Sequence, residues 1–125
     1  MLYFAGVGEA LPAVFELRDR LLARRRELPS LPLPRISLDA GPVVIGIVGG
    51  RFRRGVALIG PSVPRAARIL KLAPPGGIIA TEKVVSLAGT MSRDLVSLFD
   101  RLESPPALKG VESGTLALYL VQPAP

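Results

Sequence analysis

The chain has 125 residues, a formal net charge of +6, and neither cysteine nor histidine. These absences exclude disulfides, thiolate chemistry and the commonest general base and metal ligand. Because 49% of the residues are hydrophobic, we expect residues 1–125 to form one domain with a core of its own. The sequence shows no membrane-length apolar run and no signal peptide, so we expect a cytoplasmic protein without a membrane partner.

The N-terminal part predicts a short strand followed by a long helix. Residues 2–4 are a brief apolar run, expected to be a strand, and a glycine turn follows them. Residues 11–28 should form a helix, with Pro12 in its first turn, where a missing N–H is harmless. One apolar face at helical spacing is expected to be the buried one, and it contains Ala10, Val14, Leu17, Leu21 and Leu28.

The same helix is unusually basic, because it contains Arg18, Arg20, Arg24, Arg25 and Arg26. Such a cluster can bind nucleic acid or can be an ordinary solvated face. The interleaved acids Glu16, Asp19 and Glu27 favour the solvated face. Aromatic residues make up only 5% of the chain and there is no tryptophan, so stacking of single strands is unsupported. We therefore expect no nucleic-acid partner.

The middle of the chain predicts three strands. Residues 35–39 alternate apolar and polar side chains, as a half-buried strand does. Residues 43–48 are almost continuously apolar and β-branched, which predicts a fully buried strand. Residues 56–59 are a further short strand, and the basic residues 51–54 form an exposed connection before it.

A second helix is expected to begin at Ser62 and to run to about Leu72. Ser62 is a favourable N-cap, and Pro64 is tolerated in the first turn. The Pro-Pro-Gly-Gly sequence at residues 74–77 predicts a turn, and residues 78–80 predict another strand.

The C-terminal part continues this alternation. Thr81 should cap a helix over residues 82–88. Residues 95–102 fit a helix or a strand, residues 114–121 predict a final strand, and residues 122–125 are expected to fray. Interleaved helices and strands place the chain in the α/β or α+β class.

Residues 59–77 read Ile-Gly-Pro-Ser-Val-Pro-Arg-Ala-Ala-Arg-Ile-Leu-Lys-Leu-Ala-Pro-Pro-Gly-Gly. This segment resembles the signature of class III nucleotidyl cyclases, Ile-Gly-Asp-Thr-Val-Asn-Leu-Ala-Ala-Arg-Leu, which precedes a Pro-Gly turn. Residues 35–49 and residues 73–81 are similar to the family's neighbouring segments. Residues 108–111 with residues 118–121 resemble its closing segments, so four pieces occur in the family's order.

The resemblance implies an incomplete ferredoxin-like α+β sandwich, with helices packed on a mixed, mostly antiparallel sheet. Residues 1–4 match the family's third strand, so its first strand and metal-binding hairpin would precede this sequence. Without the first strand the sheet would have unpaired edges, which are prone to association. The chain must then repack, borrow a strand or associate. We expect a homo-oligomer or a cyclase-like partner domain.

The family's reaction uses two aspartates that hold two divalent cations, and neither aspartate position is present in this sequence. We therefore expect no metal site and no Mg²⁺ or Mn²⁺ unless a partner supplies the ligands. The base-reading position matches Ala57, and the signature Asp and ribose Asn match Pro61 and Pro64, none of which has a polar side chain. Arg68 matches the arginine that stabilises the transferring phosphoryl group, and Lys109 matches a triphosphate-binding lysine.

Arg68 has a simpler interpretation as well. Arg65, Arg68 and Lys71 are three residues apart and would form one basic helix face. The remaining candidate carboxylates do not match the family's metal positions, and they are Asp39, Asp94 and Asp100.

Three hypotheses follow. The first is a catalytically inactive cyclase-like domain for dimerisation or regulation of signalling, pairing through residues 43–48, residues 51–54 and the helix after Ser62. The second is a cyclase half-site, which would make cyclic nucleotide only with a partner chain supplying the metal-binding aspartates, and would use Arg68 and Lys109. The third is that the chain is a fragment of a longer protein.

Overall fold

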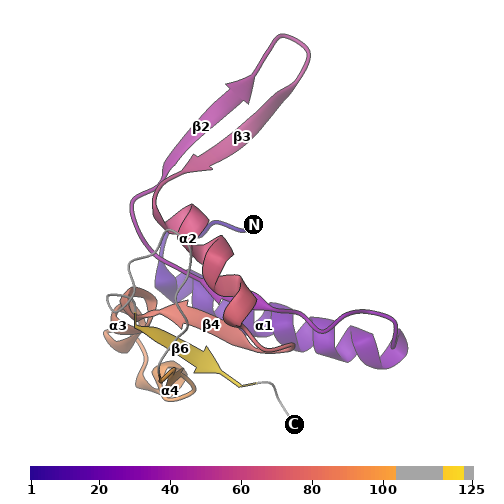
Figure 1. Cartoon of the computed structure of the whole chain (residues 1–125), viewed down its shortest axis with the longest axis vertical. Helices are drawn as coiled ribbons and strands as arrows, with labels where there is room; N and C mark the ends of the chain where they lie inside the picture. Colours follow the sequence, from indigo (N-terminus) through magenta and orange to yellow (C-terminus); the bar gives the residue numbers. More distant parts are fainter. Residues whose placement is uncertain (104–116, 123–125) are drawn as a thin grey trace.

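The structure is a computed structural model that describes residues 1–103 and 117–122. Its elements alternate along the chain as the sequence predicts (Figure 1). In order they are α1 (Val7–Glu27), β1 (Ile36–Leu38), β2 (Val44–Gly49), β3 (Arg54–Ile59), α2 (Ser62–Ile69), the 3-10 helix η1 (Leu70–Leu72), β4 (Ile78–Thr81), α3 (Glu82–Gly89), α4 (Arg93–Val96), β5 (Asp100–Arg101) and β6 (Leu118–Val121).

The main sheet has the strand order β1-β4-β6-β5. β1 and β4 are parallel, with Ile36 opposite Ile78, whereas β6 is antiparallel to both β4 and β5. The expected mixed, mostly antiparallel sheet is therefore confirmed. All four residues of β4 are buried, because this strand is paired on both edges and covered on both faces.

Helices cover both faces of this sheet. Ile78 and Ala80 point into a core completed by α1 and α3, whereas Ile79 points into a second core with Ile69 of α2 and Leu118 of β6. The alternation follows from the two-residue period of a strand. α1 and α2 therefore lie on opposite sides of the sheet, and Figure 1 shows α1 behind it and α2 in front.

β2 and β3 form a separate antiparallel hairpin that projects away from the sheet (Figure 1). Both strands were expected, but the prediction that residues 43–48 are buried is wrong for this single chain. Five of the six residues of β2 are exposed, because none of the described elements covers either face of the hairpin. Residues 51–54 are exposed, as predicted, but the connection is shorter than expected because β3 already begins at Arg54.

The N-terminal predictions need two corrections. Residues 2–4 do not form a strand. The helix begins earlier than expected, at Val7, so Pro12 lies inside it rather than in its first turn. The proline removes one N–H from the helical ladder, and the carbonyl of Gly8 loses that donor.

The buried face of α1 also differs from the predicted one. The helix buries Leu11, Val14 and Arg18, whereas Leu17 and Leu21 are 39% and 38% exposed. The face of α1 that packs on the core is thus turned around the helix axis relative to the apolar face predicted from the sequence. An arginine takes one buried position, and part of the apolar stripe is left uncovered.

The remaining elements follow the sequence with small shifts. Ser62 is the first residue of α2 rather than its cap, and Pro61 occupies the N-cap. The α-helix ends at Ile69 and continues as η1. Thr81 is the N-cap of α3, but its hydroxyl does not bond a helix N–H.

The ambiguous residues 95–102 contain the end of α4 and the two-residue β5. The final strand is confirmed at residues 118–121, while residues 114–116 and the tail after Gln122 lie outside the described residues.

Candidate functional site

A cavity of about 790 Å³ lies along the free edge of β1, between α1 and α2. We call it the slot. Its floor is β1, and residues 1–7 line it at the N-terminal end. Its walls are mostly apolar, with Ala10, Val14 and Leu17 on α1, Ala66 and Ala67 on α2, and Leu70 at the start of η1. Figure 1 shows the start of the chain close to α2.

A buried carboxylate stands at one end of the slot. The side chain of Asp39 is only 1% exposed and forms an ion pair with Arg65 of α2. Its Oδ1 accepts hydrogen bonds from Arg65 Nη2 at 3.0 Å and from the Thr81 hydroxyl at 2.9 Å. Its Oδ2 accepts a hydrogen bond from Arg65 Nε at 2.5 Å. The cluster thus joins the end of β1 to α2 and to the start of α3, and the carboxylate is fully occupied by protein donors.

The hydrogen bond to Asp39 raises the pKa of Arg65 above its ordinary value, partial burial opposes this shift, and the charge of Asp39 adds to it. The stabilisation by a raised arginine pKa is complete at neutral pH and is lost only at strongly alkaline pH. Titration of Arg65 therefore does not make this pair a pH switch near neutral pH. Sequence reasoning missed it, because the two residues are 26 positions apart and no motif connects them.

Arg68 has a different environment from Arg65. It lies one turn further along α2, is exposed, and makes no hydrogen bond or ion pair with the described residues. Because Arg65 is held by Asp39, the basic face of Arg65, Arg68 and Lys71 is not uniform: only Arg68 and Lys71 are exposed. Lys109 lies outside the described residues.

The three other residues that the resemblance matches to the family's nucleotide-binding positions have no polar side chain. Ala57 is on β3 opposite Gly46, and Pro61 and Pro64 are exposed at the start of α2. The cyclase signature also has a glycine at the position of Gly60. Packing requires a glycine here, because a Cβ would lie 2.3 Å from the carbonyl oxygen of Pro42. Within residues 1–103 and 117–122, no three acidic side chains gather as a metal site would require.

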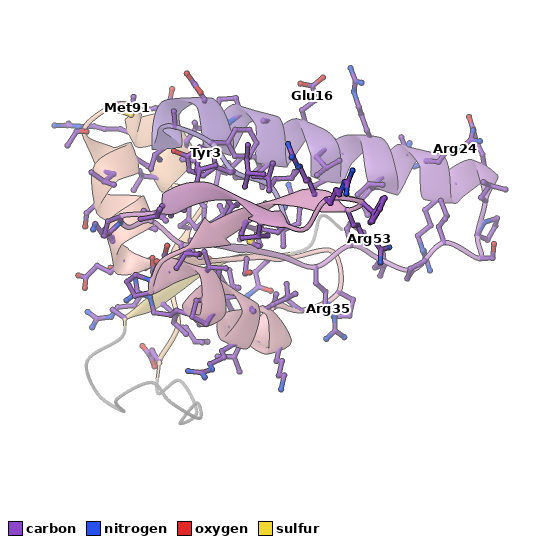
Figure 2. All side chains as sticks on the ribbon, turned by 90° about the horizontal axis from the view of Figure 1, so that it is seen from above. Tyr3, Glu16, Arg24, Arg35, Arg53 and Met91 are labelled. Atoms are coloured by element: carbon purple, nitrogen blue, oxygen red, sulfur yellow. The ribbon has the colours of Figure 1, made fainter. Side chains whose placement is uncertain are left out.

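The basic helix α1 behaves largely as a solvated face. Arg20 pairs with Glu16 at 2.8 Å, and Arg24 pairs with Glu27 at 2.5 Å. Figure 2 shows Glu16 pointing away from the sheet. Arg25 donates from Nε to the carbonyl of Leu31 at 2.9 Å. These partners satisfy much of the helix's charge locally.

Arg18 is the exception, because its side chain is only 10% exposed. It lies 5.2 Å from the centre of the Phe15 ring, and its Nε is 3.7 Å from a carboxylate oxygen of Asp19. Its Nε and Nη1 have no hydrogen-bond partner among the described residues. The expectation that all five arginines lie on a solvated face is therefore wrong for this one.

The part of the chain that the structure describes contains no helix long and apolar enough to cross a membrane. Neither a protein-family model nor a curated protein matches the sequence. Among solved structures, the chain is similar to the crystal structure of the adenylyl cyclase CyaB from P. aeruginosa, with a TM-score of 0.65 and 19% identity. The match covers 97% of this chain and 62% of that chain. The protein therefore has a cyclase-like α+β fold along nearly its whole length and spans less than two thirds of the cyclase it matches.

Proposed function

We propose that this chain is a catalytically inactive cyclase-like domain that pairs with another chain in the dimerisation or regulation of a signalling protein. The observation that carries the proposal is the projecting hairpin. Seven of its large apolar side chains are 51–95% exposed, and they are Val44, Ile45, Ile47, Val48, Phe52, Val56 and Ile59.

This exposure is costly for a chain on its own. Burying a valine, isoleucine or phenylalanine side chain contributes about 1.5–3 kcal/mol, and contiguous apolar surface on this scale marks an interaction site. Both outer edges of the two-stranded hairpin are also unpaired in the described structure, and such edges pair readily with other strands. A partner that covers the hairpin would recover both contributions.

The environment of the matched nucleotide positions supports the absence of catalysis. Ala57, Pro61 and Pro64 offer no hydrogen-bonding side chain to a base or ribose. The buried carboxylate of Asp39 is occupied by Arg65 and Thr81. No metal or nucleotide is therefore assigned to this site.

The oligomeric state tests the proposal. Sedimentation equilibrium at micromolar concentration should give a mass above that of the monomer. Ile47→Arg, which places a charge on the hairpin without touching the two cores, should shift the protein towards monomer. Leu98→Arg is a matched control, because Leu98 is 49% exposed outside the hairpin. A wild-type protein that stays monomeric, alone and with a cyclase-like partner, would contradict the proposal.

The alternative is a cyclase half-site completed by a partner chain that supplies both metal-binding aspartates. The exposed position of Arg68, free of partners among the described residues, favours it over a purely structural use of that side chain. The test is to mix the chain with a partner cyclase that retains both aspartates but lacks its own transition-state arginine, and to add Mg²⁺ or Mn²⁺ with ATP or GTP.

Under the alternative, cyclic nucleotide forms only in the mixture and is lost with Arg68→Ala. Lys71→Ala is the control, because Lys71 is an exposed cation on the following 3-10 helix. Activity that is absent from the mixture, or unaffected by Arg68→Ala, would leave the inactive domain as the better explanation.

A further inference from the structure

The slot has the geometry of a site for one more strand. Ile36 and Leu38 pack into the core shared with α1, whereas the hydroxyl of Ser37 donates to the carbonyl of Ala66 on α2 at 2.7 Å. The two helices therefore flank opposite faces of β1. Because the cavity lined by both helices continues past β1, a strand added beside β1 would lie between two helical layers.

The backbone of β1 is able to accept that strand. Ile36 donates its N–H to the carbonyl of Gly77 at 3.3 Å, so this residue faces β4. Successive residues of a strand point their backbone groups to opposite sides, so Ser37 points its N–H and C=O into the slot. β1 stands at the end of the strand order, and an unpaired edge of this kind is a template for another strand.

The walls of the slot determine which strand can enter. Leu17 and Val14 line it from α1, and Ala67 of α2 and Leu70 of η1 line it from the other side. Part of the apolar face predicted for α1 therefore lines this slot rather than the core, which explains why Leu17 is 39% exposed. A strand enclosed by two apolar walls must be apolar on both of its faces.

Strand β2 meets this requirement. Its side chains alternate, so Val44 and Val48 lie on one face and Ile45 and Ile47 lie on the other. Its only other residues are glycines, and none is charged. The sequence pattern is that of a buried strand, yet all four side chains are more than half exposed. In the same chain, the hairpin points away from the sheet (Figure 1).

We propose that the hairpin of a second copy of this chain fills the slot, with its β2 pairing along β1, and that the two copies exchange hairpins reciprocally. This inference rests on the proposed pairing function and specifies where the pairing occurs. Each copy would then have a sheet that continues from β1 into the partner's β2 and β3. In this dimer the hairpin of one copy would cover the slot of the other, and the slot would cover the hairpin.

The size of the exchanged surface fits a stable dimer. Each partner would bury its own hairpin, with seven large apolar side chains more than half exposed. It would also bury the slot walls, where Leu2, Tyr3, Leu17, Leu70 and Leu87 are 37–68% exposed. Full burial of such a side chain removes on the order of 100 Å² of apolar surface. Together these groups approach the roughly 800 Å² per partner of a stable interface.

Disulfide trapping tests the contact directly, because the natural chain has no cysteine. Ser37→Cys protein is mixed with one hairpin variant at a time, carrying cysteine at position 44, 45, 47 or 48, and oxidised mildly. Neighbouring strands place side chains on the same face within bonding reach. We expect mixed disulfides for one alternate pair only, either 44 and 48 or 45 and 47. Equal trapping at all four positions, or no mixed disulfide, would overturn the proposal.

Slot and hairpin variants give a second readout. By sedimentation equilibrium, Leu70→Glu in the slot and Ile47→Arg in the hairpin should each raise the dimer Kd by about tenfold or more, because each buries a charge. Leu98→Glu, outside both surfaces, should leave Kd unchanged. If Ile47→Arg dissociates the dimer but Leu70→Glu does not, the slot is wrong while the pairing function survives. A wild-type chain without any self-association would overturn the exchange.

Discussion

At the scale of single residues, two buried charges have opposite environments. Asp39 accepts hydrogen bonds from Arg65, Thr81 and the backbone N–H of Ala40. Arg18 is also largely buried, with 10% of its side chain exposed, but its Nε and Nη1 have no hydrogen-bond partner among the described residues. A buried charge is tolerated when it is paired and hydrogen-bonded, and is costly when it is not. The two sites should therefore respond in opposite directions to neutral substitutions.

Asp39→Asn should lower the free energy of unfolding by about 3 kcal/mol, the low end for breaking a buried pair, because the Arg65 side chain is still 32% exposed. Urea unfolding measures the change. Asp94→Asn is the control, since Asp94 is exposed on α4 and surface changes stay within about 0.5 kcal/mol. Equal effects of the two substitutions would show that the Asp39 cluster does not hold the fold.

Arg18→Met should raise the free energy of unfolding by about 1 kcal/mol. Methionine keeps a flexible, unbranched apolar chain, although a shorter one, and removes the poorly paired charge, while the contact with Phe15, about 0.5–1 kcal/mol, is lost. Arg20→Met, at an exposed position paired with Glu16, should change stability little. A clear loss of stability in Arg18→Met would mean that the guanidinium is better satisfied than its described contacts indicate.

At the scale of elements, the hairpin depends on close backbone contact at its base. Gly60 connects β3 to α2, and a side chain there would collide with the backbone carbonyl of Pro42. The signature glycine thus fixes how the hairpin leaves the rest of the fold. Gly46 within β2 has open space around it, so its small size is not required in the single chain.

Gly60→Ala should lower the free energy of unfolding by about 1–3 kcal/mol, because backbone must move to admit the methyl group. Gly46→Ala is the matched control and should be near neutral or slightly stabilising for the isolated chain, since alanine restricts the unfolded state more than glycine does. Thermal or urea unfolding of both variants gives the comparison. A Gly60→Ala protein as stable as Gly46→Ala would contradict the tight contact at the hairpin base.

At the scale of the whole molecule, the described part of one chain leaves both an apolar hairpin and an apolar slot uncovered. If each covers the other between copies, association and stability are linked, since a partner that binds only the folded chain stabilises it by mass action. The hairpin makes no part of either core. Changes to it should therefore alter assembly without altering the fold of the separate chain.

The thermal midpoint should consequently rise with protein concentration for the natural chain and stay constant for Ile47→Arg. Differential scanning calorimetry over a hundredfold range of concentration measures this. The far-ultraviolet circular dichroism of the variant at low concentration should match that of the natural chain. A midpoint independent of concentration in both proteins would argue against coupled assembly.

The sequence by itself determined most of the elements. Local periodicity, prolines and glycines placed α2, β4, α3 and both hairpin strands within a few residues, because these signals act over short distances. The mixed α+β class followed from their order. The resemblance to cyclases agrees with the fold shared with CyaB, whereas the roles of Arg68 and Lys109 stay predictions.

Only the tertiary structure decided which surfaces are covered. In the structure, Asp39 pairs with Arg65, which is 26 positions away in the sequence. The buried face of α1 consists of Leu11, Val14 and Arg18. Strand β2 is exposed. The physical reason is that a local pattern shows what a segment can bury, whereas the partner that buries it is set by contacts between distant segments. For β2, the local pattern predicted a buried strand, and residues 1–103 and 117–122 do not supply its cover.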